Sequence, residues 1–372
     1  MVLVKKRTWL LGGAAVAIAI VLHHLTTLHP SGLPLEQTAA DCTQANPSPD
    51  CQLSVTHRLT GHPSVMALAM SDDGQTLVSG GEDKAIRVWD VATGQLKKTL
   101  QSDSGTVQAV AISPDGKTVV SGGGDRMVRI WHLTSTQPPQ MLAGHQNILH
   151  QVAISADGNT LISTAHSEIK LWDMTTGELQ ATLLSAEPTE VSLGPLTMTT
   201  TSHARPVAIS PAGDQVLVSD HGKWTLWDVV TRQATPVSID APAFTSDVDI
   251  SPDGQFVVTV SYRQPITFFK VWDLITGELQ TQGRLSSSPE KHTLNNVVVS
   301  HDNAGDGVRI IGSTPKGLKF WSLQDKQLKA TLATESMRPL VGNRDGTVLA
   351  GVVPGFGDRP SVIHILQHPE SG

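Results

Sequence analysis

The sequence predicts an all-β fold in which one short unit recurs seven times, preceded by an N-terminal segment directed to a membrane. Three observations support this prediction: a tryptophan recurs every 41 to 55 residues, a polar turn lies upstream of each, and short alternating strands flank the turns. The recurring tryptophans are Trp89, Trp131, Trp172, Trp227, Trp272 and Trp321. The turns begin at Ser71, Ser113, Ser155, Ser210, Ser251, Ser300 and Asn343.

The basic flank and apolar run at the N-terminus come first along the chain. Lys5, Lys6 and Arg7 precede an uncharged run at residues 9–22. As a helix, this run would rise about 21 Å, short of a hydrocarbon core of about 30 Å, so the span must extend to Leu28. We interpret residues 1–8 as a cytoplasmic basic flank and residues 9–28 as a transmembrane signal-anchor. The following domain would then lie in the periplasm, a lumen or the exterior.

A cleaved signal peptide is the alternative, and it would make the protein secreted. An apolar stretch of this length behind a basic flank fits such a peptide. The residues directly after Leu22 are two histidines, two threonines and two leucines, which do not form an Ala-x-Ala cleavage pattern. This observation favours the uncleaved anchor.

A linker at residues 29–52 contains both cysteines of the chain, Cys42 and Cys51. The segment between them is rich in turn-forming residues, which can bring the two thiols together. We expect a disulfide between them if this part of the chain is exported to an oxidising compartment.

Each repeated turn is built to join two antiparallel strands. In the Ser-Pro-Asp-Gly form, proline fixes φ, aspartate bonds to the nearby backbone and glycine accepts a positive φ. In the second copy, the strands predicted around the turn span residues 107–112, 118–121 and 127–131, and an outer strand follows at 140–142.

These motifs resemble the WD40 repeat family over about residues 53–372. The resemblance rests on the repeat period, on the Gly-His pairs and on the Trp-Asp ends of the repeats. The Gly-His pairs are Gly61-His62 and Gly144-His145, and the Trp-Asp ends are Trp89-Asp90, Trp172-Asp173, Trp227-Asp228 and Trp272-Asp273. It implies a seven-bladed β-propeller of four-stranded blades around a central channel.

The two ends of this region predict how the ring closes. The last copy carries Leu366 in the tryptophan position, and only six residues follow it, so its outer strand is missing. Residues 54–59, followed by Thr60-Gly61-His62, read like the outer strand 140–142, followed by Ala143-Gly144-His145. We therefore expect the N-terminal strand to complete the seventh blade and to remove two exposed sheet edges.

The resemblance also implies a hydrogen-bonded network inside the blades. In the first copy it consists of His62, Ser79, Asp83 and Trp89. The second copy keeps Ser121, Asp125 and Trp131, and the third keeps His145, Ser163 and Trp172 but lacks the aspartate. A hydrolase triad is the alternative interpretation of these residue types. The structural interpretation is favoured because the group recurs by repeat position, and its decay along the chain predicts looser blades four to seven.

Long connections on one rim indicate a surface for partners. The links 185–204, 286–294, 261–265 and 354–360 fall on the rim that carries the d–a and b–c connections, where binding usually occurs on a rigid scaffold. Aromatic and arginine residues within the links resemble interface composition. The predicted partner-binding rim is Tyr262, Arg263, Phe356, Arg359, Lys84 and Arg126.

The leading hypothesis for function is a membrane-tethered, non-catalytic scaffold that binds proteins. The net charge of −7 argues against a nucleic-acid binder, and 16% charged residues argue against a disordered chain. No residue set has metal-ligand spacing, and no cofactor is expected. One alternative is an enzyme or small-ligand propeller that uses the central channel, although we identify no convergent polar residues there. Another is a carbohydrate binder, for which 4% aromatic residues leave few stacking platforms.

Overall fold

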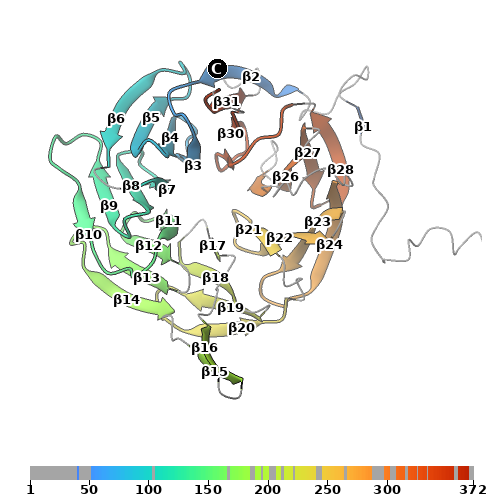
Figure 1. Ribbon diagram of the computed structural model, residues 1–372. Coiled ribbons are helices and arrows are strands. Elements are labelled where there is room, and N and C mark those ends of the chain that lie inside the picture. Colours follow the sequence, from blue (N-terminus) through green and yellow to red (C-terminus); the bar gives the residue numbers. More distant parts are fainter. Residues whose placement is uncertain are drawn as a thin grey trace, which may run out of the picture. The chain divides into compact units, whose positions relative to one another are not determined.

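The computed structural model shows seven antiparallel sheets of four strands arranged around a central channel (Figure 1). Residues 38–372 form one compact unit. The structure describes residues 40–41, 52–102, 105–165, 168–184, 189–193, 196–200, 207–210, 213–220, 223–239, 245–263, 266–286, 297–301, 307–314, 317–324, 326–332, 334–355 and 359–367. The seven-bladed propeller predicted from the repeats is confirmed.

The strands follow the chain from the channel outward in blades 1 to 6. Blade 1 consists of β3 (Val65–Met70), β4 (Thr76–Gly81), β5 (Ala85–Asp90) and β6 (Leu96–Gln101). Blade 2 consists of β7 (Val107–Ile112), β8 (Thr118–Gly123), β9 (Val128–His132) and β10 (Gln140–Leu142). Blade 3 consists of β11 (Leu149–Ile154), β12 (Thr160–Ala165), β13 (Glu168–Asp173) and β14 (Leu179–Leu184). Blade 4 consists of β17 (Val207–Ile209), β18 (Gln215–Asp220), β19 (Lys223–Asp228) and β20 (Ala234–Val237).

Blade 5 keeps this order, whereas blades 6 and 7 differ from it at their outer edges. Blade 5 consists of β21 (Thr245–Ile250), β22 (Phe256–Arg263), β23 (Ile266–Asp273) and β24 (Leu279–Ser286). Blade 6 consists of β25 (Val297–His301), β26 (Val308–Thr314), β27 (Gly317–Ser322) and β28 (Gln327–Leu332). Outside β28 lies β1 (Ala40–Asp41), in parallel orientation. Blade 7 consists of β29 (Leu340–Gly342), β30 (Val348–Val353), β31 (Val362–Gln367) and β2 (Ser54–Leu59).

The N-terminal strand β2 closes the ring. It pairs antiparallel with β31, from Ser54 opposite Gln367 to Leu59 opposite Ile363. It also contacts blade 1, because His57 Nε2 donates to the carbonyl oxygen of Ala92 at 2.9 Å. Gln140 of β10 makes the matching contact from blade 2 to blade 3, donating to the carbonyl oxygen of Thr176 at 2.8 Å. The outer strand β2 therefore behaves like the outer strand of an ordinary blade, as predicted.

The core consists of seven apolar clusters, one at each interface between neighbouring blades in the described part of the chain. The recurring tryptophans insert into these clusters, each against the preceding blade, and Leu366 takes that place in blade 7. Burying one such large side chain stabilises the fold by about 1.5–3 kcal/mol. This explains why the sequence repeats the tryptophan in six of the seven copies.

The predicted turns form as expected where the structure describes them, which excludes residues 211–212 and 302–306. In the first, Ser71 Oγ donates to Asp73 Oδ1 at 2.6 Å and accepts from the Thr76 amide at 3.0 Å. Gly74 ends the turn with φ of 69°, a conformation that disfavours other residues. In the last turn, which has no serine, Asn343 Oδ1 replaces the serine hydroxyl by accepting from the Val348 amide at 2.9 Å.

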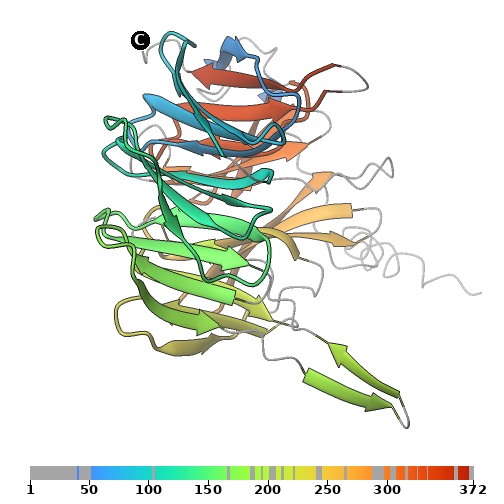
Figure 2. The same ribbon diagram turned by 60° about the vertical axis from the view of Figure 1, so that its left-hand side comes forward.

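Two of the predicted links contain strand structure. In the link 185–204, β15 (Thr189–Leu193) and β16 (Leu196–Thr200) form a hairpin that pairs only with itself and stands outside the ring (Figure 2). In the link 261–265, β22 continues through Tyr262 and Arg263, which pair with Thr267 and Ile266 of β23. The prediction of a long loop at these two residues was wrong, because both strands of blade 5 are two residues longer than those of blade 1.

The predictions for the N-terminal region concern residues that the structure does not describe. The signal-anchor at 9–28 and both Cys42 and Cys51 lie outside the described residues. Within the described part of the chain, no helix has the length and apolar character needed to cross a membrane.

Candidate functional site

The polar network predicted for blade 1 is present. Trp89 Nε1 donates to Ser79 Oγ at 2.8 Å, and Ser79 Oγ lies 2.9 Å from His62 Nε2. His62 Nδ1 lies 2.8 Å from Asp83 Oδ1. Because the Asp83 carboxylate only accepts hydrogen bonds, this contact favours the tautomer with the ring proton on Nδ1, in which Nε2 accepts the hydroxyl proton of Ser79; Arg87 Nη1, a donor, also lies 2.6 Å from Nδ1. Arg87 completes the group through a 2.7 Å ion pair to Asp83.

The hydrogen bonds connect Ser79, His62 and Asp83 in the order of a hydrolase triad, but the serine that would be the nucleophile is buried. Ser79 has 0% and His62 has 2% of its surface exposed, so a substrate has no access to the hydroxyl. The Ser79 oxygen is also held by the indole of Trp89. Burial lowers the pKa of His62, while the hydrogen bond to Asp83 acts in the opposite direction. The histidine is therefore a neutral connector in the core.

Blade 3 restores a carboxylate that the sequence analysis considered lost. His145 Nε2 lies 2.6 Å from Ser163 Oγ, which accepts from Trp172 Nε1 at 2.7 Å. On the other side of the ring, His145 Nδ1 lies 3.0 Å from Oε2 of the buried Glu168. The correction has a simple cause. The chain from Ser163 to Trp172 is one residue shorter than that from Ser79 to Trp89, and the longer glutamate reaches back from the first position of β13.

The network has fewer members in the other blades, as expected. Blade 5 keeps the bond from its tryptophan, but a threonine accepts it instead of a serine. In blade 2, Trp131 Nε1 donates to Ser121 Oγ at 2.9 Å, and Asp125 pairs with Arg129 at 2.5 Å. In blade 5, Trp272 Nε1 donates to Thr259 Oγ1 at 3.1 Å. Thr259 replaces the serine of the other blades, a substitution that sequence analysis missed but that alignment on the turn serine could have found, since Thr259 follows Ser251 by the same number of positions as Ser79 follows Ser71.

The predicted partner-binding rim is only partly described. Lys84, Arg126 and Arg359 are exposed in the b–c links of blades 1, 2 and 7, which are neighbours in the ring. Lys84 and Arg126 occupy equivalent left-handed turn positions, with φ of 63° and 66°. Arg126 Nη1 donates to the carbonyl oxygen of Gln146 at 3.2 Å, which links blade 2 to blade 3. The rim residues outside this set are Tyr262 and Arg263, described only as backbone in β22, and Phe356, which lies outside the described residues.

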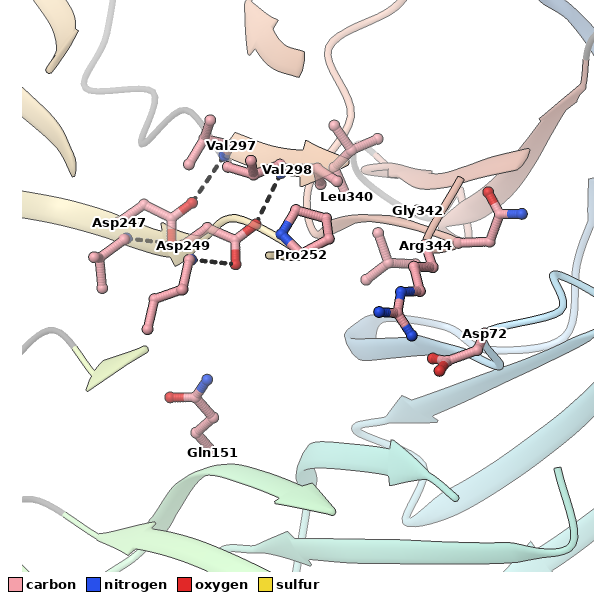
Figure 3. Close-up of a pocket in the computed structure, with 15 residues that line it drawn as sticks. Asp72, Gln151, Asp247, Asp249, Pro252, Val297, Val298, Leu340, Gly342 and Arg344 are labelled. Atoms are coloured by element: carbon pink, nitrogen blue, oxygen red, sulfur yellow. Dashed lines mark hydrogen bonds between the residues drawn. The ribbon is translucent and has the colours of Figure 1, made fainter. Parts of the chain in front are cut away.

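A pocket of about 380 Å³ lies in the central channel, where sequence analysis identified no convergent polar residues. It extends to the a–b turns, which occupy the ends of the strands opposite the b–c links. Its charged and amide-bearing side chains come from blades 1, 3, 5 and 7 (Figure 3). They are Asp72, Gln151, Asp247, Asp249, Asn343 and Arg344. The central channel therefore carries the kind of polar cluster that the small-ligand alternative requires.

Asp247 and Asp249 face the pocket from one strand, β21, and bind the edge of blade 6. Asp247 Oδ2 accepts from the Val297 amide and Asp249 Oδ2 accepts from the Val299 amide, both at 2.9 Å. These bonds satisfy amide groups on the channel-facing edge of β25, which has no further strand to pair with. Burial raises the pKa of Asp249 to about 7, and the Asp247 charge adds to this shift while the Val299 amide opposes it.

A comparison of inner strands in register would have revealed this pair. The residues four and two positions before the turn serine are Ala67 and Ala69 in blade 1, and Ala109 and Ala111 in blade 2. Blade 5 has Asp247 and Asp249 at these positions. Sequence analysis aligned the turns and tryptophans but did not compare the residues that line the channel.

Comparisons with known proteins agree with this geometry. The WD40 family, described as "WD domain, G-beta repeat", matches residues 53–90, 94–132 and 136–173. The chain is also similar to Protein Mut11 of Chlamydomonas reinhardtii, with 35% identity over 68 residues. That match covers 18% of this chain and 18% of the relative. The matched repeats coincide with β2 and blades 1 to 3, where the polar networks are most complete. The chain thus carries three tandem WD40 repeats within a seven-bladed β-propeller.

Proposed function

We propose that the protein is a non-catalytic scaffold that binds other proteins through the rim formed by the b–c links. WD40 propellers are typical of protein-interaction scaffolds, which supports this assignment. The observation that carries it is the run of three exposed cations, Arg359, Lys84 and Arg126, on the consecutive blades 7, 1 and 2. Such a run favours a partner with an acidic surface, since complementary charge guides association and orientation.

The rim proposal includes the other residues singled out in the sequence. Tyr262, Arg263 and Phe356 belong to the b–c region of blades 5 and 7, and tyrosine, arginine and phenylalanine are enriched in the centres of interfaces. Together with Lys84, Arg126 and Arg359 they constitute the proposed partner-binding rim. The absence of catalysis is part of the proposal, and the burial of Ser79 and His62 supports it.

Charge reversal on the rim tests the proposal. The variant carrying Lys84→Glu, Arg126→Glu and Arg359→Glu should lose the proteins that proximity labelling finds around the wild type. The matched control is Arg232→Glu together with Lys326→Glu, two exposed cations in c–d turns at the other ends of the strands. The scaffold proposal is wrong if the triple variant keeps the same labelled proteins, or if the control variant loses them equally.

We also propose that residues 9–28 tether this scaffold to a membrane, with the N-terminus cytoplasmic and the propeller on the exported side. Support comes from the apolar run at 9–22 behind three cationic residues. Export would also allow Cys42 and Cys51 to pair. The full chain should stay in the membrane fraction after alkaline carbonate extraction, whereas a chain lacking residues 1–30 should be released. Release of the full chain would favour the cleaved, secreted alternative.

A further inference from the structure

The central pocket plays no part in the rim proposal and has a distinctive arrangement of charge. Its volume of about 380 Å³ is at the small end of the range of about 300–1,000 Å³ usual for small-molecule sites. Carboxylates of Asp247 and Asp249 line the blade 5 side, while Arg344 stands on the a–b turn of blade 7 (Figure 3). The pocket therefore offers negative charge on one wall and a guanidinium group on another.

The groups on both walls retain hydrogen-bonding capacity for a ligand. Asp249 accepts amide protons from Val299 and Ile250, one at each oxygen, and each carboxylate oxygen has a second lone pair. Arg344 and Asp72 are exposed, and neither forms an ion pair with any residue in the described ranges. A guanidinium group recognises a carboxylate through two parallel hydrogen bonds.

The same groups argue against other classes of ligand. A simple anion would face the carboxylates of Asp72, Asp247 and Asp249, which outnumber the single cation Arg344. A metal ion would need at least three suitable side chains, and no such group of histidine, cysteine, aspartate and glutamate occurs among the described residues. An apolar ligand would displace water from the charged side chains of the pocket without forming hydrogen bonds to them.

We propose that the channel pocket binds a small zwitterion, with its ammonium group between Asp247 and Asp249 and its carboxylate on Arg344. Amino acids and short peptides have this chemistry. The site opens at the ends of the strands opposite the partner-binding rim, so the scaffold and the pocket can be occupied independently. The two proposals also fail independently, since one concerns the b–c links and the other the inner strands.

The test uses the purified full chain and a series of linear ω-amino acids as probes, with binding measured by calorimetry. The series 4-aminobutanoate, 6-aminohexanoate and 8-aminooctanoate varies the separation of the two charges. Hexylamine and hexanoate each supply only one of them. At least one zwitterion should bind about tenfold or more tightly than both single-charge probes, because a hydrogen bond to a charged group contributes that much.

Variants assign the two ends of the ligand. Arg344→Gln should weaken the zwitterion about tenfold but leave hexylamine unchanged, whereas Asp249→Asn should weaken both. Lys326→Gln, which changes a cation in a c–d turn outside the pocket lining, should change neither. Circular dichroism melting identifies any variant that fails to fold, and the comparison of probes on the wild type does not depend on the variants.

The pH profile gives a separate signature. Asp249, with a pKa of about 7, must lose its proton to pair with an ammonium group, which stays protonated to about pH 10. The ionisable groups around it in the described lining are Asp247 on its own strand, Asp72 from blade 1 and Arg344 from blade 7. Affinity for the zwitterion should therefore rise from pH 6 to pH 8, and the rise should vanish in Asp249→Asn.

The proposal is overturned if every zwitterion fails to bind at millimolar concentrations. It is also overturned if hexylamine or hexanoate binds as tightly as the best zwitterion, or if Arg344→Gln has no selective effect.

Discussion

Blades 1 and 3 differ from blades 5 and 7 in the hydrogen bonds at the repeated tryptophan position, although all four blades have the same four-stranded architecture. In blades 1 and 3, the tryptophan continues into a serine, a histidine and a carboxylate. Blade 5 has a single bond from Trp272 to Thr259, and blade 7 has Leu366 in place of tryptophan. The blade fold therefore depends on apolar packing between neighbours and on the a–b turns. The polar network adds stability without determining the architecture.

We expect the largest effect from removing the strand that links blade 7 to blade 1. Deleting residues 53–60 removes β2, which connects blade 7 to blade 1 and covers the outer edge of β31. We expect loss of cooperative unfolding and of solubility, because the outer edge of β31 and part of an apolar cluster become exposed. Thermal melting and light scattering measure this.

Replacing residues 189–200 with a short Gly-Ser linker is the matched control. This removes a hairpin that pairs only with itself, so the melting transition of the ring should stay in place. If the β2 deletion melts like the wild type, the strand does not close the ring in solution.

Loss of a single hydroxyl should cost more in blade 3 than in blade 5. Ser163→Ala leaves both Trp172 Nε1 and His145 Nε2 without their partner in the core. We expect the free energy of unfolding to fall by about 2–4 kcal/mol, since each unsatisfied buried group costs about 1–3 kcal/mol. Thr259→Val, which removes the bond from Trp272 Nε1 and a long 3.5 Å bond to the Lys270 carbonyl oxygen, should cost about 1–2 kcal/mol.

Denaturant unfolding of both variants provides the measurement. Equal losses for the two variants would show that the network in blade 3 adds nothing beyond its tryptophan bond. Hydrogen exchange sharpens the same comparison, because blades 1 and 2 should exchange more slowly than blades 6 and 7. Faster exchange in blades 1 and 2 would contradict the prediction that the later blades are looser.

The two regions should also respond to pH in opposite directions. Burial lowers the pKa of His62 and His145. As pH falls below about 6.5, these histidines therefore bind protons in the unfolded chain but stay neutral in the folded protein. Stability from these histidines is therefore lost in acid. The raised pKa of Asp249, about 7, acts in reverse, because the folded state keeps a proton that the unfolded state has released. Stability from blade 5 is thus lost as pH rises from about 4 to about 7.

Asp249→Asn isolates the effect of Asp249. Relative to wild type, the variant should gain about 1 kcal/mol of stability between pH 6 and pH 8, measured by urea unfolding at each pH. The control Asp273→Asn alters an exposed turn carboxylate whose pKa is lowered by hydrogen bonds, chiefly from the Thr276 amide. Its difference from wild type should stay constant over the same range. A constant difference for Asp249→Asn as well would show that Asp249 does not titrate with a pKa of about 7 in the folded protein.

The sequence was sufficient for the number of blades and their closure because these follow from spacing. The tryptophan period counts the units, and the segment at 54–59 resembles the outer strand at 140–142. The network of blade 1 could also be predicted, since its members occupy fixed offsets from Trp89. These features repeat, so each copy supports the interpretation of the others.

Features that do not repeat were missed or misplaced. Glu168 escaped notice because a one-residue deletion moved the carboxylate from the turn into β13, where the longer side chain compensates. The loop expected at Tyr262 and Arg263 is strand, because the extra residues of blade 5 extend its pairing instead of bulging outward. The sequence did not reveal the pocket because its walls come from blades far apart in the chain. Only the closed ring places Asp249 and Arg344 in the same pocket.

Closure by β2 also constrains the order of events during biosynthesis. Thr56 Oγ1 donates to the carbonyl oxygen of Ile365, a partner 309 positions later in the chain. A nascent chain emerging from the ribosome exposes this strand long before its mate exists, and contacts so distant in sequence form slowly. Until β31 arrives, the edge of β2 is unpaired and open to mispairing.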